Sequence, residues 1–241
     1  MGKDIANAWL KTFSRTFVIN LERREDRRRE ATHELRRIGL QIDGERVTFF
    51  RALEPLDAFP FASRGEKGCY LSHLEVLRQA SAALEGVVLV MEDDFCFFRH
   101  FLRHGAEMLN DLSTREWDLA QLGALSYQAH PRFRRHPFWA AGRTWGFGTH
   151  CYAVRARAAC QIVAFLESQI QAASGHLPLD LAMDRLLAVN MAVQIVSARR
   201  PIAFQRPSPS DLRSNATLRL PRIFRPFSEL AYTEYVRAKL F

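Results

Sequence analysis

The fold of this chain is decided by the stretch Val87-Val88-Leu89-Val90-Met91-Glu92-Asp93-Asp94, an unbroken apolar run that ends on three consecutive acids. A run of this length is typical of a buried strand in a parallel sheet, which delivers its last side chains to the edge of the sheet. Because side chains alternate along an extended chain, we expect Glu92 and Asp94 to share one face and Asp93 to take the other. Two hard oxygen ligands on one face predict a site for Mg²⁺ or Mn²⁺. A strand end capped by solvated acids is the alternative.

The composition bounds the class of protein. With 241 residues, 48% of them hydrophobic, the chain can bury one sizeable core or two small ones. Lys and Arg outnumber Asp and Glu by 34 to 26, a formal charge of +8, which favours anionic partners such as nucleotide diphosphates, acidic glycolipids, membranes or nucleic acid.

The cysteines and the hydropathy pattern indicate a compartment. Four scattered cysteines form no C-x-x-C pair, so we expect reduced thiols in a cytoplasmic protein. The N-terminus lacks an apolar signal core, and no run approaches the ~20 apolar residues that a bilayer span needs. We therefore expect neither secretion by a signal peptide nor a spanning helix.

Apolar periodicity predicts strands that alternate with helices along most of the chain. Besides the acid-tipped run, we expect strands over residues 16–21, 46–51, 117–122, 149–154 and 192–197. We expect helices over residues 23–37, 65–83, 101–112, 155–171 and 180–189, an amphipathic lead over 5–13, a long loop over 127–147, a Pro/Arg-rich wrapping segment over 199–227 and a short helix over 228–240. This order predicts one α/β domain across residues 1–241, with a mostly parallel central sheet.

Ligands of such sheets bind at the C-terminal edges of the strands. The first strand ends at Asn20 and Leu21 and runs into an arginine-rich helix start, where free backbone N–H groups and the helix dipole favour phosphate. The other distinctive edge carries the three acids. We therefore expect a nucleotide to lie across both edges, with its base near the first and its diphosphate near the acids.

Three motifs follow one another in the chain: Val18-Ile19-Asn20-Leu21-Glu22-Arg23-Arg24-Glu25-Asp26-Arg27-Arg28, Gly68-Cys69-Tyr70-Leu71-Ser72-His73 and Met91-Glu92-Asp93-Asp94. In order and spacing they resemble the "INL-x-R-x-x-DRR" opening, the "GC-x-x-SH" helix and the acidic motif of glycosyltransferase family 25, the lipooligosaccharide and collagen galactosyltransferase group. Looser matches at Trp117-Asp118, Tyr152-Ala153-Val154 and Pro178-Leu179-Asp180 extend the resemblance over residues 16–211.

The resemblance implies a GT-A-like nucleotide-binding sandwich that uses a UDP-sugar donor and Mn²⁺ or Mg²⁺. It also implies an inverting transfer of a hexose, most often galactose from UDP-galactose, to a hydroxyl of an acceptor. Glu92 and Asp94 would then hold the metal. The donor-binding residues that it implies are Asn20, Leu21, Arg24, Arg27, Ser72, His73 and Asp93.

An inverting transfer needs a base that takes the proton of the acceptor hydroxyl. We predict Asp180 for this role, with Asp184, one helical turn on, in reserve. Asp180 could instead be only a helix N-cap, and His73 only a satisfied buried histidine. We assign Trp139 and Trp145 to an acceptor site because aromatic rings suit stacking on sugar faces, although both could be core residues.

The predicted partners are a nucleotide-sugar donor and a glycan or glycolipid acceptor of lipopolysaccharide or lipooligosaccharide biosynthesis. The basic loops would contact anionic membrane at its inner, cytoplasmic face. A basic nucleic-acid-binding protein is one alternative, but the acids would repel a phosphate backbone unless a metal covered them, so we expect no nucleic acid. A catalytically inactive transferase fold that only binds ligands is the other.

Overall fold

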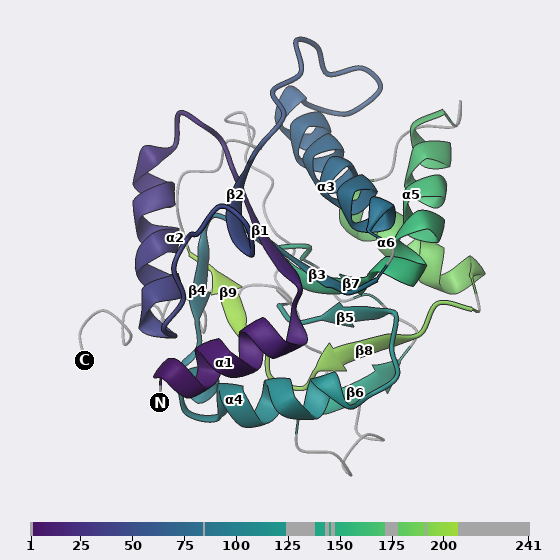
Figure 1. The fold of residues 1–241 in the computed structure, drawn as a ribbon. Coiled ribbons are helices and arrows are strands. Elements are labelled where there is room, and N and C mark those ends of the chain that lie inside the picture. Colours follow the sequence, from purple (N-terminus) through teal and green to yellow (C-terminus); the bar gives the residue numbers. More distant parts are fainter. Residues whose placement is uncertain are drawn as a thin grey trace, which may run out of the picture.

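The computed structural model describes residues 2–83, 85–123, 138–142, 145, 148–171, 178–190 and 192–206. Within these residues a seven-stranded sheet in the order β2-β1-β3-β7-β5-β8-β6 forms the centre, and β4 pairs with β9 in a second, two-stranded sheet (Figure 1). The strands are β1 (Arg15–Asn20), β2 (Val47–Arg51), β3 (Val87–Glu92), β4 (Phe95–Phe97), β5 (Leu119–Gln121), β6 (Trp139–Gly142), β7 (Cys151–Arg155), β8 (Ile195–Ala198) and β9 (Ala203–Gln205).

The direction of the strands confirms a mostly parallel sheet. β1 is parallel to β2 and β3, and β5 is parallel to β8. β7 is antiparallel to both β3 and β5, so the group β2-β1-β3 and the pair β5-β8 run in the same direction. β6 is antiparallel to β8. β7 and β6 thus oppose the other strands of the sheet. The sheet therefore collects most of its C-terminal strand ends along one edge.

Helices cover both faces of the sheet. They are α1 (Gly2–Thr12), α2 (Glu25–Arg37), α3 (Arg64–Ala82), α4 (Arg99–Ser113), α5 (Ala156–Gln171) and α6 (Leu179–Val189). Alternation along β3 separates two cores: Leu89 and Met91 pack with α1, α2 and α4, whereas Val88 and Val90 pack with α3, α5 and α6. The figure shows α1 and α4 together on one side and α3, α5 and α6 on the other (Figure 1).

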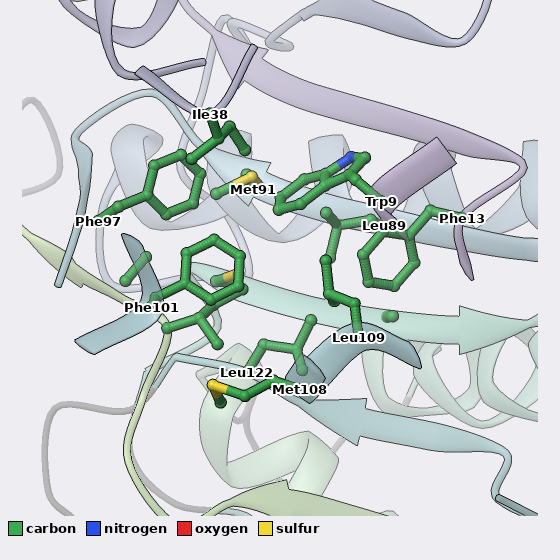
Figure 2. Close-up of a cluster of buried hydrophobic side chains, with 14 of the residues drawn as sticks. Trp9, Phe13, Ile38, Leu89, Met91, Phe97, Phe101, Met108, Leu109 and Leu122 are labelled. Carbon is green, nitrogen blue, oxygen red and sulfur yellow. The ribbon is translucent and has the colours of Figure 1, made fainter. Parts of the chain in front are cut away.

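The first core is built around Trp9 (Figure 2). Its indole ring meets Phe13 edge to face at 5.1 Å and Phe97 at 5.9 Å between ring centroids. The buried indole N–H donates to Thr16 Oγ1 at 2.9 Å, which satisfies the one polar atom of the side chain. The amphipathic lead is therefore a packed helix of the domain, α1, as its periodicity predicts.

The end of α2 follows from a glycine. Gly39 adopts a φ of +81°, which a residue without a Cβ takes at little cost. The N–H of Gly39 donates to Arg36 O at 3.0 Å and the N–H of Leu40 to Leu35 O at 3.0 Å, so the last carbonyls of the helix are satisfied. The helix stops where the sequence predicts, but it begins at Glu25, two residues later than expected.

Some elements differ from the prediction. β4, β6 and β9 are short strands that the sequence pattern did not indicate, and β6 lies inside the segment expected to be a long loop. β9 lies inside the expected wrapping segment, of which residues 207–227 fall outside the described residues, as does the helix expected over 228–240. The single-domain assignment for residues 1–241 therefore stays a prediction. Among the described helices, none is long and apolar enough to cross a bilayer.

Candidate functional site: an acid-rich cleft at the strand ends

A cleft of about 770 Å³ opens at the C-terminal ends of β1 and β3. Ile19 of β1 pairs with Glu92 of β3, so the two strand ends that the sequence singled out lie side by side. The cleft is lined by Ile19, Leu21, Arg23, Arg27, Ala52, Leu53, Glu54, Pro55, Arg64, Gly65, Glu66, Gly68, Cys69, Ser72, His73, Glu92, Asp93, Asp94, Gly148, Thr149, Pro178, Leu179, Asp180, Gln205 and Arg206.

The three acids sit at the tip of β3. The strand itself ends at Glu92, and Asp93 and Asp94 form the turn into β4. The prediction that Glu92 and Asp94 share one face of an extended strand is therefore wrong, because the strand ends at Glu92. All three acids nevertheless line the cleft. Arg206 holds the turn from the other side: its backbone N–H donates to Asp94 O at 2.8 Å and its Nη2 to Asp93 O at 3.0 Å.

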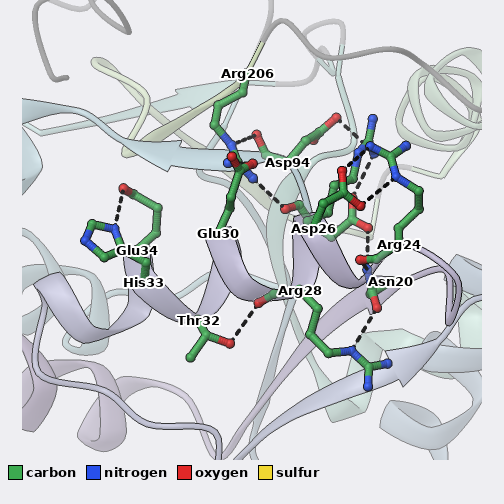
Figure 3. Close-up of polar contacts among 12 residues, drawn as sticks. Asn20, Arg24, Asp26, Arg28, Glu30, Thr32, His33, Glu34, Asp94 and Arg206 are labelled. Carbon is green, nitrogen blue, oxygen red and sulfur yellow. Dashed lines mark hydrogen bonds and ion pairs between the residues drawn. The ribbon is translucent and has the colours of Figure 1, made fainter.

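Asp93 is bound by two residues of the first motif. Asn20 Nδ2 donates to Asp93 Oδ2 at 2.7 Å, and Arg27 Nη1 donates to Asp93 Oδ1 at 2.9 Å. Arg27 Nη1 also lies 3.5 Å from Asp94 Oδ2. Asn20 is itself fixed by Arg28, whose Nε donates to Asn20 Oδ1 at 3.1 Å (Figure 3). Asn20 and Arg27 therefore position the acidic turn in this structure.

The other predicted donor residues divide into two groups. Leu21 and Ser72 line the cleft, whereas Arg24 is not among its lining residues and directs its guanidinium at Asp26, 2.9 Å from Oδ2 (Figure 3). Ser72 Oγ donates to Gly68 O at 2.6 Å and accepts from the N–H of Leu53 at 2.8 Å. Ser72 thus joins α3 to the segment that follows β2.

His73 and Glu92 face one another across the floor of the cleft. His73 is fully buried; its Nδ1 lies 3.1 Å from the hydroxyl of Tyr152 and its Nε2 lies 3.6 Å from Glu92 Oε1. Gln205 Nε2 donates to the other oxygen, Glu92 Oε2, at 2.9 Å. Burial raises the pKa of Glu92, but the close approach of His73 and the charges of His150 and Arg27 outweigh it, so the pKa of Glu92 is lowered overall.

Four other carboxyls that line the cleft have raised pKa values, first of all because of burial: those of Glu66, Asp93, Asp94 and Asp180. Burial and the negative charge of Glu92 raise the pKa of Asp94 to about 7, against the opposing charge of Arg27. The same two causes, burial and then Glu92, raise the pKa of Asp180 to about 6. In the part of the chain that the structure describes, the buried Oδ1 atoms of Asp94 and Asp180 accept no hydrogen bond.

The charge balance of the cleft is the reverse of that of the whole chain. Four arginines and six carboxylates line it, a formal excess of two negative charges in a chain of net charge +8. Buried carboxylates that repel one another, with the Oδ1 atoms of Asp94 and Asp180 left without a hydrogen bond from the described residues, fit a divalent cation with a preference for oxygen ligands. Glu92 and Asp94 are thus chemically suited to Mg²⁺ or Mn²⁺.

The two catalytic candidates on α6 have different environments. Asp180 lies in the first turn of the helix and lines the cleft, and its predicted alternative as an N-cap does not hold, because the cap residue is Pro178. Asp184 is not among the lining residues, and its Oδ1 accepts from the backbone N–H of Trp145 at 3.0 Å. Of the two, Asp180 therefore lines the cleft and Asp184 makes a contact within the fold.

Trp139 and Trp145 are core residues. Trp139 begins β6 and is 2% exposed, and Trp145 is 6% exposed and packs edge to face on Tyr152 at 5.7 Å between ring centroids. Rings with so little exposed surface offer no face on which a sugar can stack. Their assignment to an acceptor site is therefore corrected, and the reason is burial on opposite faces of the sheet.

Several cleft residues were not assigned a role from the sequence. Cys69 lies in the second motif, four residues before His73, a spacing that places both on one helix face and could have drawn attention to it. Gln205 and Arg206 reach the acids through the pairing of β9 with β4. No local pattern signals that pairing, because it joins segments about a hundred residues apart.

Comparison with known proteins places these features in a family. Residues 13–183 match the family model described as glycosyltransferase family 25 (LPS biosynthesis protein). Procollagen galactosyltransferase 1-A of Xenopus laevis is 33% identical over 133 residues, which cover 46% of this chain and 21% of that protein. A glycosyltransferase 25 family member of Aedes aegypti is 32% identical over 127 residues, with 46% and 21% covered. The chain thus spans about a fifth of the length of the curated relatives that it matches.

Among solved structures the similarity is distant. The inositol-1-phosphate CTP transferase from T. maritima is 13% identical, with a TM-score of 0.41 over 95% of this chain and 82% of that one. The apo-form glycosyltransferase GlyE of Streptococcus pneumoniae is 10% identical, with a TM-score of 0.38 over 99% and 60%. Because the family model matches well over half of the sequence, from residue 13 to residue 183, the chain belongs to glycosyltransferase family 25.

Proposed function

We propose that this chain is a metal-dependent inverting glycosyltransferase that moves a hexose from a UDP-sugar to a hydroxyl of a glycan or glycolipid. The observation that carries the proposal is the net negative cleft in a basic protein of this family. A nucleotide diphosphate is repelled from such a cleft unless a divalent cation offsets the carboxylates. A nucleic-acid-binding site, the alternative from another class, would present the opposite charge.

The metal proposal rests on Glu92 and Asp94. Their carboxylates would hold Mn²⁺ or Mg²⁺ at the tip of β3, which β1 flanks. When bound, the cation supplies positive charge that stabilises the departing diphosphate. Asn20 and Arg27 support this site indirectly, because both bind Asp93 and so keep the acidic turn in place.

The donor proposal rests on the walls of the cleft and on the names of the relatives. Leu21, the residue after β1, lines the cleft next to the acids, as do Ser72 and His73 of α3. Four of the curated relatives that the chain matches are named procollagen galactosyltransferase, which supports galactose as the sugar. We therefore propose UDP-galactose as the first donor to test, with the nucleoside against the segment after β1.

Asp180 is the proposed catalytic base. It lines the cleft, its carboxyl pKa is raised to about 6 by burial and by Glu92, and its Oδ1 accepts no hydrogen bond from the described residues. A carboxylate with this pKa is ionised at pH 7 yet more basic than an exposed aspartate, which suits it to accept the proton of an acceptor hydroxyl. Asp184 supports it by fixing the backbone at Trp145.

The acceptor proposal rests on two exposed apolar side chains. Leu56 is 91% exposed and Phe59 is 83% exposed, in the segment between β2 and α3. Leu53 and Pro55 of the same segment line the cleft, so this apolar surface lies beside its mouth. It supports a glycolipid acceptor of lipopolysaccharide or lipooligosaccharide biosynthesis, bound at the cytoplasmic face of a membrane. Replacing Leu56 and Phe59 by serine should slow transfer to a lipid-linked acceptor but not to the same sugar in free form.

The test of the function measures nucleotide release from a panel of UDP- and GDP-sugars with and without Mn²⁺. Asp94→Asn keeps the size of the side chain and removes its charge, and should lower turnover by about 10²–10³-fold while the protein stays folded. Asp111→Asn makes the same change on α4, where Asp111 pairs with Arg115, and should leave turnover unchanged.

The outcomes separate the alternatives. Metal-dependent release from one UDP-sugar in the wild type and the α4 control, with loss in Asp94→Asn, supports the transferase. Tight donor binding with neither hydrolysis nor transfer would instead identify an inactive fold that binds ligands. No binding of any sugar nucleotide, combined with salt-dependent binding of oligonucleotides in metal-free buffer, would overturn the proposal in favour of nucleic acid.

A further inference from the structure

A second set of ligand atoms lies on the floor of the same cleft. The thiol of Cys69, a ring nitrogen of His73 and a carboxylate oxygen of Glu92 all lie within 4.8 Å of one another. Cys69 and His73 are one turn apart on α3, so both side chains leave the same face of that helix toward the end of β3. This set differs from the all-oxygen pair Glu92 and Asp94.

The orientation of His73 points to a ligand. Its Nδ1 is fixed by the hydroxyl of Tyr152 at 3.1 Å, and its ring stacks on that of Tyr152 at 5.7 Å between centroids. The fully buried Nε2 therefore faces Glu92 and makes no hydrogen bond within the described residues. Its distance of 3.6 Å from Glu92 Oε1 is close to the ~3.3 Å that separates two ligands of a tetrahedral zinc ion with bonds of about 2 Å.

A second partner that orients a metal-binding histidine is typical of metal sites, because it fixes the tautomer and frees the other nitrogen. Tyr152 occupies that position here. Cys69 carries a thiol, and a cation that binds its sulfur displaces the thiol proton.

We propose that Cys69, His73 and Glu92 bind a thiophilic divalent cation, Zn²⁺ first, with the fourth position open toward the cleft. The sulfur and nitrogen ligands select against Mg²⁺ and Mn²⁺, which prefer oxygen. All three residues line the cleft, so a cation can reach the site from solvent.

The two sites share one carboxylate. Glu92 Oε2 is held by Gln205 at 2.9 Å, which leaves Oε1 as the oxygen that faces His73. A zinc ion on Oε1 therefore competes with a catalytic cation that needs the same carboxylate. This part of the inference rests on the proposed function, because it requires the oxygen-ligand site at Glu92 and Asp94.

The experiment is a titration of the metal-free full chain with Co²⁺, which substitutes for Zn²⁺ and gives a thiolate-to-cobalt charge-transfer absorption only when sulfur binds it. We expect this band to saturate at one equivalent in the wild type and in Cys160→Ser, which removes an exposed cysteine. Cys69→Ser should lose the band. Absence of the band in the wild type, or its persistence in folded Cys69→Ser, overturns the proposal.

A second measurement uses only the wild-type protein, so it tests the site even if Cys69→Ser fails to fold. Alkylation of Cys69, mapped by mass spectrometry, should slow at least tenfold when Zn²⁺ is added, whereas alkylation of exposed Cys160 should not change. Equal alkylation of Cys69 with and without Zn²⁺ would overturn the site.

Asp94→Asn distinguishes this inference from the proposed function. The variant should keep the cobalt–thiolate band, because Asp94 is not one of the three ligands, while it loses sugar transfer. If the wild-type protein showed the cobalt–thiolate band but transferred no sugar from any donor, the zinc site would stand and the proposed transferase activity would be overturned. A band that Mn²⁺ leaves unchanged at saturating concentration would overturn the shared-carboxylate step.

Discussion

The core that β3 crosses and the cleft at its tip serve different purposes. Leu89 and Met91 lie in a closed aromatic core with α1 and α4, where shape and buried area decide the structure (Figure 2). One residue further on, Glu92 lines a cleft in which carboxylates repel one another and the buried Oδ1 atoms of Asp94 and Asp180 accept no hydrogen bond from the described residues. The difference teaches that the core of this protein stabilises a site that is itself destabilising, as is common at functional sites. Removing a ring from the core should therefore lower stability, whereas neutralising a buried carboxylate of the cleft should raise it.

The largest effect is expected in the core. Trp9→Ala removes a fully buried indole and should lower the free energy of unfolding by about 3–5 kcal/mol. Trp9→Phe keeps a ring against Phe13 but loses the hydrogen bond to Thr16, and should cost about 1–2 kcal/mol. Urea unfolding measures both. If folded Trp9→Ala bound UDP-sugar more weakly than the wild type, the separation of core and cleft would be wrong.

The sign should reverse at Asp180. Its folded-state pKa of about 6 lies above its ordinary value of 3.8, because of burial and Glu92, with hydrogen bonds from Gly148 and Thr149 opposing. The stability from this raised pKa is complete below pH ~4 and is lost as the pH rises through about 6. Asp180→Asn cannot ionise, so in metal-free buffer at pH 7.5 it should be more stable than the wild type by about 2–3 kcal/mol.

That gain should shrink toward zero as the pH falls from 8 to about 4, which thermal unfolding across this range would follow. The same variant should lose sugar transfer if Asp180 is the base. A variant that is less stable than the wild type at every pH would show that the ionised carboxylate is satisfied, and would place Asp180 with the structural residues.

A smaller loss is expected in the wall of the cleft. A Cβ added to Gly68 would lie 2.5 Å from Leu53 O, so the segment after β2 must move away from α3. Gly68→Ala should cost about 1–3 kcal/mol and weaken donor binding. Gly44→Ala is the matched control, since nothing lies within 4 Å of its added Cβ and only its φ of +79° opposes the change, at about 1 kcal/mol. Equal donor affinity in the two variants would show that this wall does not shape the site.

The smallest change in the free energy of unfolding is expected at a surface ion pair that lies in neither the core nor the cleft. Arg78 of α3 pairs with Glu167 of α5 at 2.7 Å, but both side chains are more than a third exposed to water. Arg78→Ala should therefore change the free energy of unfolding by less than about 0.5 kcal/mol. A loss comparable to that of Trp9→Ala would show that α3 and α5 depend on charge more than on their buried apolar contacts.

Local patterns predicted the parts of the fold that local forces decide. The apolar run of β3, the periodicity of α1 and the glycine that ends α2 each carry their own signal, and the structure confirms them. The two tryptophans were misjudged because proline and arginine around them resemble an exposed loop. Tertiary contacts override such a pattern, and β6 brings Trp139 into the core.

The residues of the site were predictable to the extent that motifs contain them. Glu92, Asp93, Asp94 and His73 all line the cleft. The sequence could not show that Arg24 contacts Asp26 whereas Arg27 contacts Asp93. The difference depends on where α2 begins, because Arg24 precedes the helix and Arg27 lies in its first turn. Nor could it reveal Gln205, whose contact with Glu92 depends on the pairing of β4 with β9.

That pairing has a consequence for how the protein is made. Arg206 and the acidic turn are separated by more than a hundred residues, yet the backbone and guanidinium of Arg206 bind the carbonyls of Asp93 and Asp94. During synthesis the ribosome releases the three acids long before β9 and Arg206 emerge. The nascent chain therefore carries its carboxylates without their last anchor, and the site is completed only when nearly all of the described fold has left the ribosome.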